Sequence, residues 1–479
     1  MKKYSLNNLE IGSHVHLMGI CGTAMASLAG LLKDKGFIVT GSDSHPYPPM
    51  STQIESLGIE ILKPYATKNL NPKPDFIIVG NVISASNIEA QEMNRLEIPH
   101  CSLPQAMGEY IIADRNSFVV SGTHGKTTTT SMVSWILDQA GMKPGFLIGG
   151  IAKNFSKSFC TPEKNTFVIE GDEYDTAYFD KVPKFIHYKP QQVILTSVEF
   201  DHADIYNDLD HVKSAFIQLM KLIPETGNLV FWGDDPNVTE VSKECKIKNK
   251  YSFGFDLKNN YQIKILSESE KSVIFQISGS DNLKIICEID QIGKYNILNA
   301  TAAALITYSN GVDPQIIIRS LKTFKGVKRR QEILGEYNGV TLIEDFAHHP
   351  TAVRQTIEAV QNKYKKRKVF SVFEPRSATS RRKIFQKDYF DAFLKAQESI
   401  IATAFDQSKL DSADRFSVDD LVSSLNLAGH KSQSLASADH IVKYLSTVTK
   451  PTDIILIMSN GGFDDIYNKL MTELNLKAV

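Results

Sequence analysis

Residues 117–141 read SFVVSGTHGKTTTTSMVSWILDQAG: a strand pattern, a glycine-containing turn and a helix pattern in direct succession. Gly122 and Gly125 permit a turn that bulkier residues resist, and they let backbone N–H groups approach phosphates. Lys126 adds positive charge to that turn, and the Thr127 hydroxyl can ligate a magnesium ion shared with a nucleotide. The stretch predicts a loop that binds ATP and Mg²⁺, made of Gly122, Thr123, Gly125, Lys126, Thr127 and Thr128.

The general phosphate-loop pattern, G-x-x-x-x-G-K-[ST], is not fully met, because Val120 stands where its first glycine belongs. The alternative interpretation is a strand-to-helix turn with an exposed lysine. A strand, two glycines, a Lys-Thr pair and a helix in this order favour phosphate binding over that alternative.

Two acidic segments end later strand patterns: residues 169–173 read IEGDE and residues 199–202 read EFDH. Carboxylates and imidazoles at the C-terminal ends of strands lie where α/β proteins commonly bind ligands and cations. Either segment alone is typical of a solvated acidic loop. Together with the phosphate loop, they predict ligands for a cation.

Strand-like and helix-like patterns alternate through the first hundred residues and again after residue 325, which predicts parallel strands with crossover helices. Between them, residues 261–290 alternate in polarity like antiparallel strands, and residues 296–324 read as helices. The chain length also suits about three domains. We expect an α/β protein divided at 1–112, 113–324 and 325–479.

The composition excludes several classes of protein. Lys+Arg 53 against Asp+Glu 54 gives a net charge of -1, so no basic field would attract nucleic acid or a membrane surface. The five cysteines are scattered singly, unlike a zinc site or a disulfide scaffold. No signal-peptide pattern or membrane-spanning apolar run is present. These features predict a cytoplasmic protein that binds neither nucleic acid nor a membrane.

Six segments in order resemble the Mur ligase superfamily, the ATP-dependent enzymes that build the peptide of bacterial peptidoglycan precursors. They are SGTHGKTTTT, VIEGDEYD, SVEFDHADIY, GKYNILNA, GVKRRQE and EDFAHHPTAV, and they extend over nearly the whole chain. The resemblance implies a Rossmann-like UDP-sugar domain, a central P-loop ATPase-like domain and a Rossmann-like peptide-binding domain. It also implies that a carboxylate is activated as an acyl phosphate, which an amine then attacks.

The resemblance assigns roles to individual residues. Lys126, Glu170, His202 and Arg330 would be catalytic, and Thr127, Glu170 and His202 would hold magnesium. Further ATP contacts would come from Asn296, Asn299, Arg330 and Asp345. His124 and Arg376 are weaker candidates for orienting the sugar carboxylate or its acyl phosphate.

The N-terminal segments GICGTAM (19–25) and GSD (41–43) resemble the branches of the superfamily that act on UDP-N-acetylmuramate itself. That resemblance assigns Gly22, Thr23, Ser42 and Asp43 to sugar-nucleotide binding. A dinucleotide site is the rival interpretation, but G-x-G-x-x-G would require glycine in place of Cys21.

Two branches use that acceptor: one adds L-alanine, and the murein peptide ligases attach a recycled L-alanyl-γ-D-glutamyl-diaminopimelate tripeptide. GICGTAM, YPPMS (47–51), GDEYD, DHADIY, FEPRS and MSNGGF look like the second branch. A non-catalytic nucleotide-sugar binding protein and a simple ATPase are alternatives from other classes. The third residue of the peptide, tolerance of longer peptides, the extent of domain closure and the oligomeric state are left open.

Some positions depart from the family pattern. Ser197 and Tyr295 stand where asparagine and histidine are usual, which leaves the nucleotide contacts there open. The adjacent His348 and His349 favour loop packing over a metal site, because neighbouring side chains on regular structure point apart and no third ligand is near in sequence.

Overall fold

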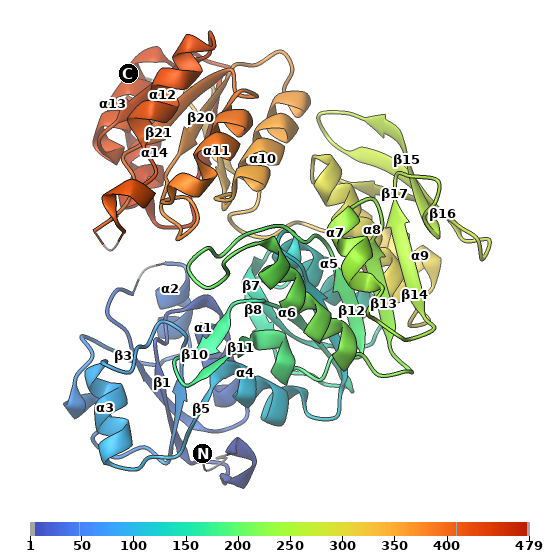
Figure 1. The fold of residues 1–479 in the computed structure, drawn as a ribbon, viewed down its shortest axis with the longest axis vertical. Helices are drawn as coiled ribbons and strands as arrows, with labels where there is room; N and C mark the ends of the chain where they lie inside the picture. Colours follow the sequence, from blue (N-terminus) through green and yellow to red (C-terminus); the bar gives the residue numbers. More distant parts are fainter. Residues whose placement is uncertain (1–4, 47, 409, 477–479) are drawn as a thin grey trace.

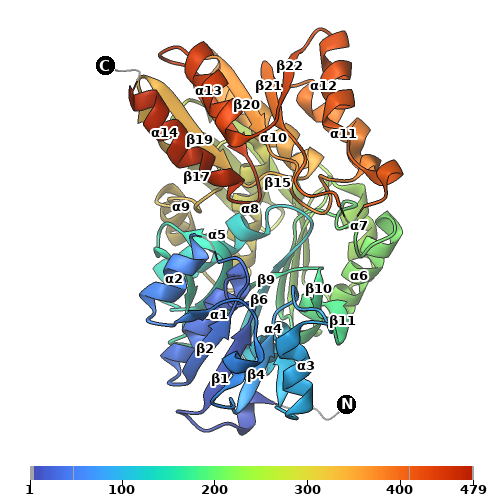
Figure 2. The ribbon, with the colours of Figure 1, turned by 90° about the vertical axis from the view of Figure 1, so that its left-hand side faces the viewer.

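The computed structural model describes residues 5–46, 48–408 and 410–476; Tyr47, the first residue of YPPMS, lies outside them. The described residues form three main β-sheets flanked by helices, plus one small hairpin (Figure 1). The N-terminal and C-terminal sheets lie at opposite ends of the molecule, with the central sheet between them (Figures 1 and 2). The predicted α/β class is confirmed.

The N-terminal sheet is parallel throughout, with strand order β3-β2-β1-β4-β5. Its strands are β1 (His14–Met18), β2 (Ile38–Ser42), β3 (Ile61–Leu62), β4 (Phe76–Val79) and β5 (His100–Ser102). Its helices are α1 (Thr23–Asp34), α2 (Met50–Ser56), α3 (Ile88–Arg95) and α4 (Leu103–Ala106), and a π-helical turn follows at Met107–Ile112. The parallel pairing matches the expectation from alternating strand and helix patterns.

The central sheet has the strand order β17-β16-β15-β14-β13-β12-β6-β9-β7-β8. Its strands are β6 (Asn116–Ser121), β7 (Gly145–Ala152), β8 (Lys157–Cys160), β9 (Thr166–Gly171), β12 (Gln192–Leu195), β13 (Asn228–Trp232), β14 (Lys250–Gly254), β15 (Tyr261–Glu268), β16 (Val273–Gly279) and β17 (Lys284–Ile289). Strands β15, β16 and β17 pair antiparallel, as their alternating polarity predicted.

The helices of the central domain are α5 (Lys126–Gln139), α6 (Leu209–Leu222), α7 (Pro236–Ser242), α8 (Lys294–Tyr308) and α9 (Pro314–Lys322). A separate hairpin joins β10 (Asp175–Ala177) to β11 (Asp180–Pro183). The parallel strands β6, β9 and β12 lie side by side, so their C-terminal ends meet at one edge of the sheet. That edge carries the phosphate loop and both acidic segments.

The C-terminal sheet has the order β18-β19-β23-β20-β21-β22 and is parallel except for the edge strand β18. Its strands are β18 (Glu332–Tyr337), β19 (Val340–Asp345), β20 (Val369–Phe373), β21 (Glu398–Ala402), β22 (Lys431–Leu435) and β23 (Ile454–Met458). Its helices are α10 (Pro350–Lys363), α11 (Gln386–Phe393), α12 (Val418–Leu427), α13 (Ala438–Val448) and α14 (Ile466–Leu476). Short 3-10 turns occur at Leu6–Asn8, Thr67–Leu70, Lys184–His187, Lys383–Phe385, Ser412–Asp414 and Phe463–Asp465.

The N-terminal domain packs directly on the central one. A Cβ atom on Gly30 of α1 would lie 2.0 Å from Cζ of Phe159 on β8, so only glycine fits this contact. Beside it, the hydroxyls of Ser27 and Ser158 are 2.8 Å apart. Apolar side chains of both domains form one continuous core, and this core fixes the two domains against each other.

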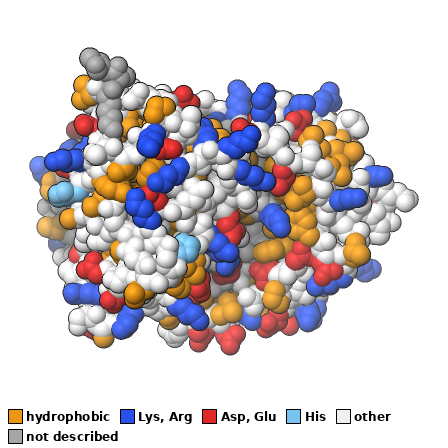
Figure 3. Space-filling model, turned by 90° about the horizontal axis from the view of Figure 1, so that it is seen from above, with side chains coloured by type: hydrophobic (Ala, Val, Ile, Leu, Met, Phe, Trp, Pro, Cys, Tyr) orange, Lys and Arg blue, Asp and Glu red, His pale blue; other side chains and the backbone are white. Residues whose placement is uncertain are grey.

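Within the described ranges, no helix is long and apolar enough to cross a membrane. All five cysteines are free thiols. Basic and acidic side chains both occur across the face shown in Figure 3, in keeping with a net charge close to zero.

Candidate functional site

The loop between β6 and α5 depends on its two glycines. Gly122 and Gly125 have φ angles of 128° and 83°, which favour glycine. A Cβ on Gly122 would lie 2.2 Å from the Thr196 hydroxyl, and one on Gly125 would lie 2.4 Å from Asn299 Oδ1. The loop is therefore held tightly between β12 and α8, with Gly125 capping the start of α5.

Lys126 begins α5 and faces a group of carboxylates. Its Nζ donates to Gly122 O at 2.7 Å and to Glu173 Oε2 at 2.8 Å, and it lies 3.9 Å from Asp172 Oδ1. Burial opposes the charge on Lys126, but Glu173 and Asp172 more than offset this effect and raise its pKa. Lys126 is thus held in its charged form beside the loop.

Thr127 and Glu170 place two oxygen ligands side by side. Thr127 Oγ1 donates to Glu170 Oε2 at 3.1 Å, and the Gly149 amide donates to the other oxygen of Glu170. Arg330 Nη2 lies 3.3 Å from Thr127 Oγ1. Burial raises the pKa of Glu170, although Gly149 and Arg330 oppose that shift. A cation at this carboxylate would relieve its desolvation.

His202 lies beside the same two carboxylates that face Lys126. Its Nε2 is 3.6 Å from Glu173 Oε1, and ligand atoms of Asp172, Glu173 and His202 all lie within 4.8 Å of one another. Glu173 Oε1 is buried and has no hydrogen-bond partner among the described residues. Hard oxygen ligands and an orphaned buried carboxylate oxygen fit a divalent cation.

The far end of the site is built by α8 and β19. Asn299 Nδ2 donates to Asn296 Oδ1 at 3.3 Å, and Asn296 Nδ2 donates to Ile292 O at 2.8 Å. Asp345 accepts from the amides of Gln331 (2.8 Å) and Ala347 (2.7 Å), and burial raises its pKa. These contacts fix the polar groups that sequence reasoning assigned to the nucleotide.

A single cavity of about 1360 Å³ connects these groups between the central and C-terminal domains. Its lining includes Thr123, His124, Gly125, Lys126, Thr127, Thr128, Glu170, His202, Asn296, Asn299, Arg330 and Asp345. Trp232 and Phe253 add aromatic surface. Gly122 of the loop is not among the lining residues, and its carbonyl accepts from Lys126 Nζ. The volume and the mixed lining suit a nucleotide together with the group it phosphorylates.

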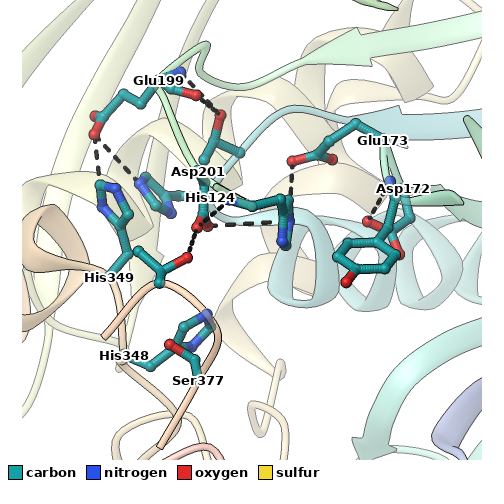
Figure 4. Close-up of polar contacts among 12 residues, drawn as sticks. His124, Asp172, Glu173, Glu199, Asp201, His348, His349 and Ser377 are labelled. Carbon is teal, nitrogen blue, oxygen red and sulfur yellow. Dashed lines mark hydrogen bonds and ion pairs between the residues drawn. The ribbon is translucent and has the colours of Figure 1, made fainter. Parts of the chain in front are cut away.

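A cluster at the domain junction also lines this cavity. Glu199 Oε2 accepts from Thr351 Oγ1 at 2.6 Å and lies 3.4 Å from His124 Nε2, and the His124 and His349 rings are 4.7 Å apart (Figure 4). Despite burial, the neighbouring imidazoles of His124 and His349 and the hydrogen bond from Thr351 lower the pKa of Glu199 to about 2. Burial and the neighbouring His124 lower the pKa of His349 to about 4.

The predicted sugar-nucleotide residues lie on the N-terminal domain, outside this cavity. Gly22 and Thr23 begin α1, and Asp43 accepts from the amides of Cys21 (3.0 Å) and His45 (3.1 Å). The Ser42 side chain is buried and donates to Glu89 Oε2 at 2.5 Å. Gly22, Thr23 and Asp43 thus share the loop edge of one parallel sheet, whereas Ser42 supports that edge from within.

Arg376 also lies outside the cavity lining. Its guanidinium carbon is 3.9 Å from the Phe405 ring centroid, and Nη1 is 3.4 Å from Glu374 Oε1. Gly461 packs against its side chain, since a Cβ there would lie 2.3 Å from Arg376 Cδ. The structure therefore groups Arg376 with the loops after β20 and β23, away from the phosphate loop.

Sequence reasoning named the acidic segments that hold Asp172, Glu173 and Glu199 but gave these three carboxylates no individual partners, and it assigned His349 to loop packing. The acidic segments were visible in the sequence, but their register decides which carboxylate reaches Lys126. His349 carried no such signal, because its neighbours in the fold come from the phosphate loop and from the end of β12.

Three family models match the chain: Mur ligase family, catalytic domain (14–115), Mur ligase middle domain (120–307) and Mur ligase, glutamate ligase domain (329–461). The UDP-N-acetylmuramate–L-alanyl-gamma-D-glutamyl-meso-2,6-diaminoheptandioate ligase of Escherichia coli K12 is 37% identical, covering 97% of this chain and 99% of that protein. The UDP-N-acetylmuramate–L-alanine ligase of Clostridium tetani is 31% identical, covering 97% and 98%.

Solved structures give a similar result. The murein peptide ligase of Psychrobacter arcticus 273-4 superposes with a TM-score of 0.76 at 33% identity, covering 97% of this chain and 99% of that one. The UDP-N-acetylmuramate-alanine ligase of Thermotoga maritima has a TM-score of 0.80 at 21% identity, covering 97% and 100%, and supports the fold alone.

Proposed function

Because the chain belongs to the Mur ligase family, we propose that it joins L-alanyl-γ-D-glutamyl-meso-diaminopimelate to UDP-N-acetylmuramate in peptidoglycan recycling. The chain is an ATP-dependent carbon–nitrogen ligase with the three-domain architecture of that family. The observation that carries the substrate is the full-length identity: 35–37% to two ligases named for this tripeptide, against 31% to the L-alanine ligase of Clostridium tetani.

We assign the proposed substrates to domains 1–112 (UDP-sugar), 113–324 (ATP) and 325–479 (peptide). In the first step, the sugar carboxylate attacks the γ-phosphate, which forms an acyl phosphate and releases ADP. In the second step, the unprotonated peptide amine attacks the acyl carbon. The bond from that carbon to the phosphate oxygen breaks, the amide forms, and phosphate leaves with the proton that the amine loses. Atoms and charge balance without a further reactant.

The residues of the cavity match these steps. Lys126 and Arg330 supply positive charge beside the phosphate loop, where negative charge concentrates during phosphoryl transfer. Thr127, Glu170 and His202 would hold magnesium, with Asp172 and Glu173 beside His202, and bound magnesium would neutralise charge on the phosphates. Asn296, Asn299 and Asp345 would contact the nucleotide further along the cavity.

His124 remains a candidate for orienting the sugar carboxylate or its acyl phosphate, because it lines the cavity within the phosphate loop. Arg376 is better placed for a carboxylate of the peptide, since it lies at the ends of the C-terminal strands outside the cavity. Gly22, Thr23, Ser42 and Asp43 stay proposed for the UDP-sugar. A cytoplasmic location follows from these substrates.

Product analysis tests the proposal. Purified protein is incubated with ATP, magnesium and UDP-N-acetylmuramate, with L-alanine or the tripeptide offered separately, and products are identified by mass. Tripeptide ligation supports a recycling enzyme. Ligation of L-alanine alone would favour the biosynthetic alternative, and binding without any product would favour a nucleotide-sugar binding protein.

A further inference from the structure

Three side chains from distant parts of the sequence meet where the central and C-terminal domains touch. His124 comes from the phosphate loop, Glu199 follows β12, and His349 caps the start of α10. One ligand atom of each lies within 4.8 Å of the others. Figure 4 shows the two imidazoles converging on Glu199, apart from the Asp172–Glu173 group. The reaction steps described above leave this convergence unexplained.

Hydrogen bonding fixes the ring state of His349. Its Nε2 faces Phe200 O at 3.1 Å, and a carbonyl oxygen can only accept, so Nε2 carries the proton. Its Nδ1 accepts from the Thr351 amide at 3.3 Å, so Nδ1 carries none. The ring is therefore neutral, and the one lone pair of Nδ1, which lies 3.8 Å from Glu199 Oε2, accepts from the Thr351 amide. An ion bound to Nδ1 would replace this 3.3 Å hydrogen bond.

His124 faces the same carboxylate oxygen. Its Nε2 lies 3.4 Å from Glu199 Oε2, yet this buried nitrogen makes no hydrogen bond within the described part of the chain. Glu199 Oε2 and His349 Nδ1 thus lie within 4.8 Å of a buried His124 nitrogen that has no hydrogen-bond partner. Such a group of electron donors is stabilised by a shared cation.

We propose that His124, Glu199 and His349 form a transition-metal site, separate from the magnesium site, that ties the phosphate loop to the C-terminal domain. Two imidazoles and one carboxylate favour Zn²⁺, Co²⁺ or Ni²⁺ over Mg²⁺, which prefers oxygen ligands. Tetrahedral ligands about 2.1 Å from an ion lie about 3.4 Å apart. The distances of 3.4 Å and 3.8 Å to Glu199 are near that value.

The fold gives an ion access to this site. All three residues line the large cavity, and the exposed fractions of their side chains are 19% for His124, 30% for Glu199 and 6% for His349. An open fourth position on the ion would face the cavity. The ion would then bridge the central and C-terminal domains. It would also bind His124, the residue proposed above to orient the sugar carboxylate.

Cobalt absorption tests the site directly. The full-length protein, without nucleotide or substrates, is titrated with Co²⁺ in excess Mg²⁺ while visible ligand-field bands are followed. We expect one equivalent of Co²⁺ to give the intense bands of a four- or five-coordinate ion. This readout needs no ligation, so failure here and failure of the proposed function are distinguishable.

Matched variants locate the ion. His349→Asn keeps a helix-capping acceptor, and Glu199→Gln keeps an acceptor for Thr351, so both preserve local packing. Both should abolish the bands, whereas His348→Asn and His202→Asn should retain them. Circular dichroism and the thermal unfolding temperature verify the fold of each variant. Absence of the bands in the wild type, or their loss in His202→Asn with retention in His349→Asn, would overturn the proposal.

Discussion

Lys126 Nζ lies 2.8 Å from Glu173 Oε2, and the Glu173 side chain is only 1% exposed. The lysine therefore neutralises a buried carboxylate as well as offering charge to a phosphate. Removing Lys126 should affect both activity and stability, and the two effects can be separated.

For Lys126→Ala, we expect the turnover number to fall by about 10²–10³, as when a preorganised donor to transition-state charge is removed. Stability should fall by about 3–5 kcal/mol, because a buried charge loses its partner. The double variant Lys126→Ala/Glu173→Ala should recover the thermal unfolding temperature but not turnover. Phosphate release and calorimetry measure the two effects. Near-normal turnover in Lys126→Ala would refute its catalytic role, and Lys164→Ala is the control.

The Thr127–Glu170 pair predicts a specific magnesium defect. Glu170→Gln keeps an oxygen for the Gly149 amide but removes the charge next to Thr127 Oγ1. The magnesium concentration for half-maximal ADP release should rise about 10- to 100-fold, in the range seen when groups supporting a metal are changed. His202→Ala should behave similarly, and Glu163→Gln should not. If added magnesium never alters the deficit and bound metal is unchanged, the ligand assignment is wrong.

Much of the fold follows from local patterns, and the exceptions have physical reasons. The apolar run of β12 and the alternation through β15–β17 predicted strands that the structure contains. Strand β22 reads KSQSL and carried no such signal, because its extended form depends on pairing with β21 at the edge of the sheet.

The site also has a part that local sequence predicts and a part that it does not. The spacing of Gly125, Lys126 and Thr127 identifies a phosphate loop without any tertiary information. The sequence does not show whether Glu170, Asp172 or Glu173 contacts Lys126. Successive side chains of a strand point to opposite faces, and β9 ends at Gly171, so Asp172 and Glu173 lie beyond the regular strand. The contact of His349 with His124 depends on how two domains dock, which no local pattern encodes.

Alanine substitutions at Gly22 and Gly125 should have different effects on stability and on substrate use. Gly22 has a φ of −63°, and a Cβ there would lie no closer than 3.4 Å to any neighbour, the nearest being the Gly19 carbonyl, so Gly22→Ala should fold normally. If backbone there approaches the UDP phosphates, the added methyl should raise the KM for UDP-N-acetylmuramate but not for ATP. Gly125→Ala should instead lose stability by about 1–2 kcal/mol and impair ATP use, given its positive φ and the Asn299 clash. An unchanged sugar KM in Gly22→Ala would remove Gly22 from the site.

The buried carboxylate of Glu89 should make the stability of the N-terminal domain sensitive to acid. Burial opposes its charge, but the neighbouring His16 imidazole and hydrogen bonds from Ser42, Asn69 and the Ala66 amide outweigh burial and lower its pKa. The pKa of Glu89 in the folded protein therefore lies below its unfolded value of 4.5. The charge of Glu89 stabilises the fold above pH 4.5, and this stabilisation is lost as the pH falls from 4.5 through the folded pKa. Glu89→Gln should lower the thermal unfolding temperature at pH 7 yet show a smaller further fall on acidification. Parallel pH profiles of variant and wild type would contradict this role.

Arg376 offers a test of peptide recognition. Its guanidinium stacks on Phe405 and lies beside Glu374, so it is held in place with the stem packed on Gly461. A charged hydrogen bond to a peptide carboxylate contributes about 1.5–3 kcal/mol, so Arg376→Gln should raise the KM for the tripeptide about 10- to 100-fold. The KM values for ATP and UDP-N-acetylmuramate should change little, and Lys383→Gln, an exposed charge nearby, serves as the control. A selective rise for UDP-N-acetylmuramate would instead assign Arg376 to the sugar carboxylate. An equal rise for all three substrates would indicate that Arg376 acts on domain packing, because only a contact with one substrate can affect its KM alone.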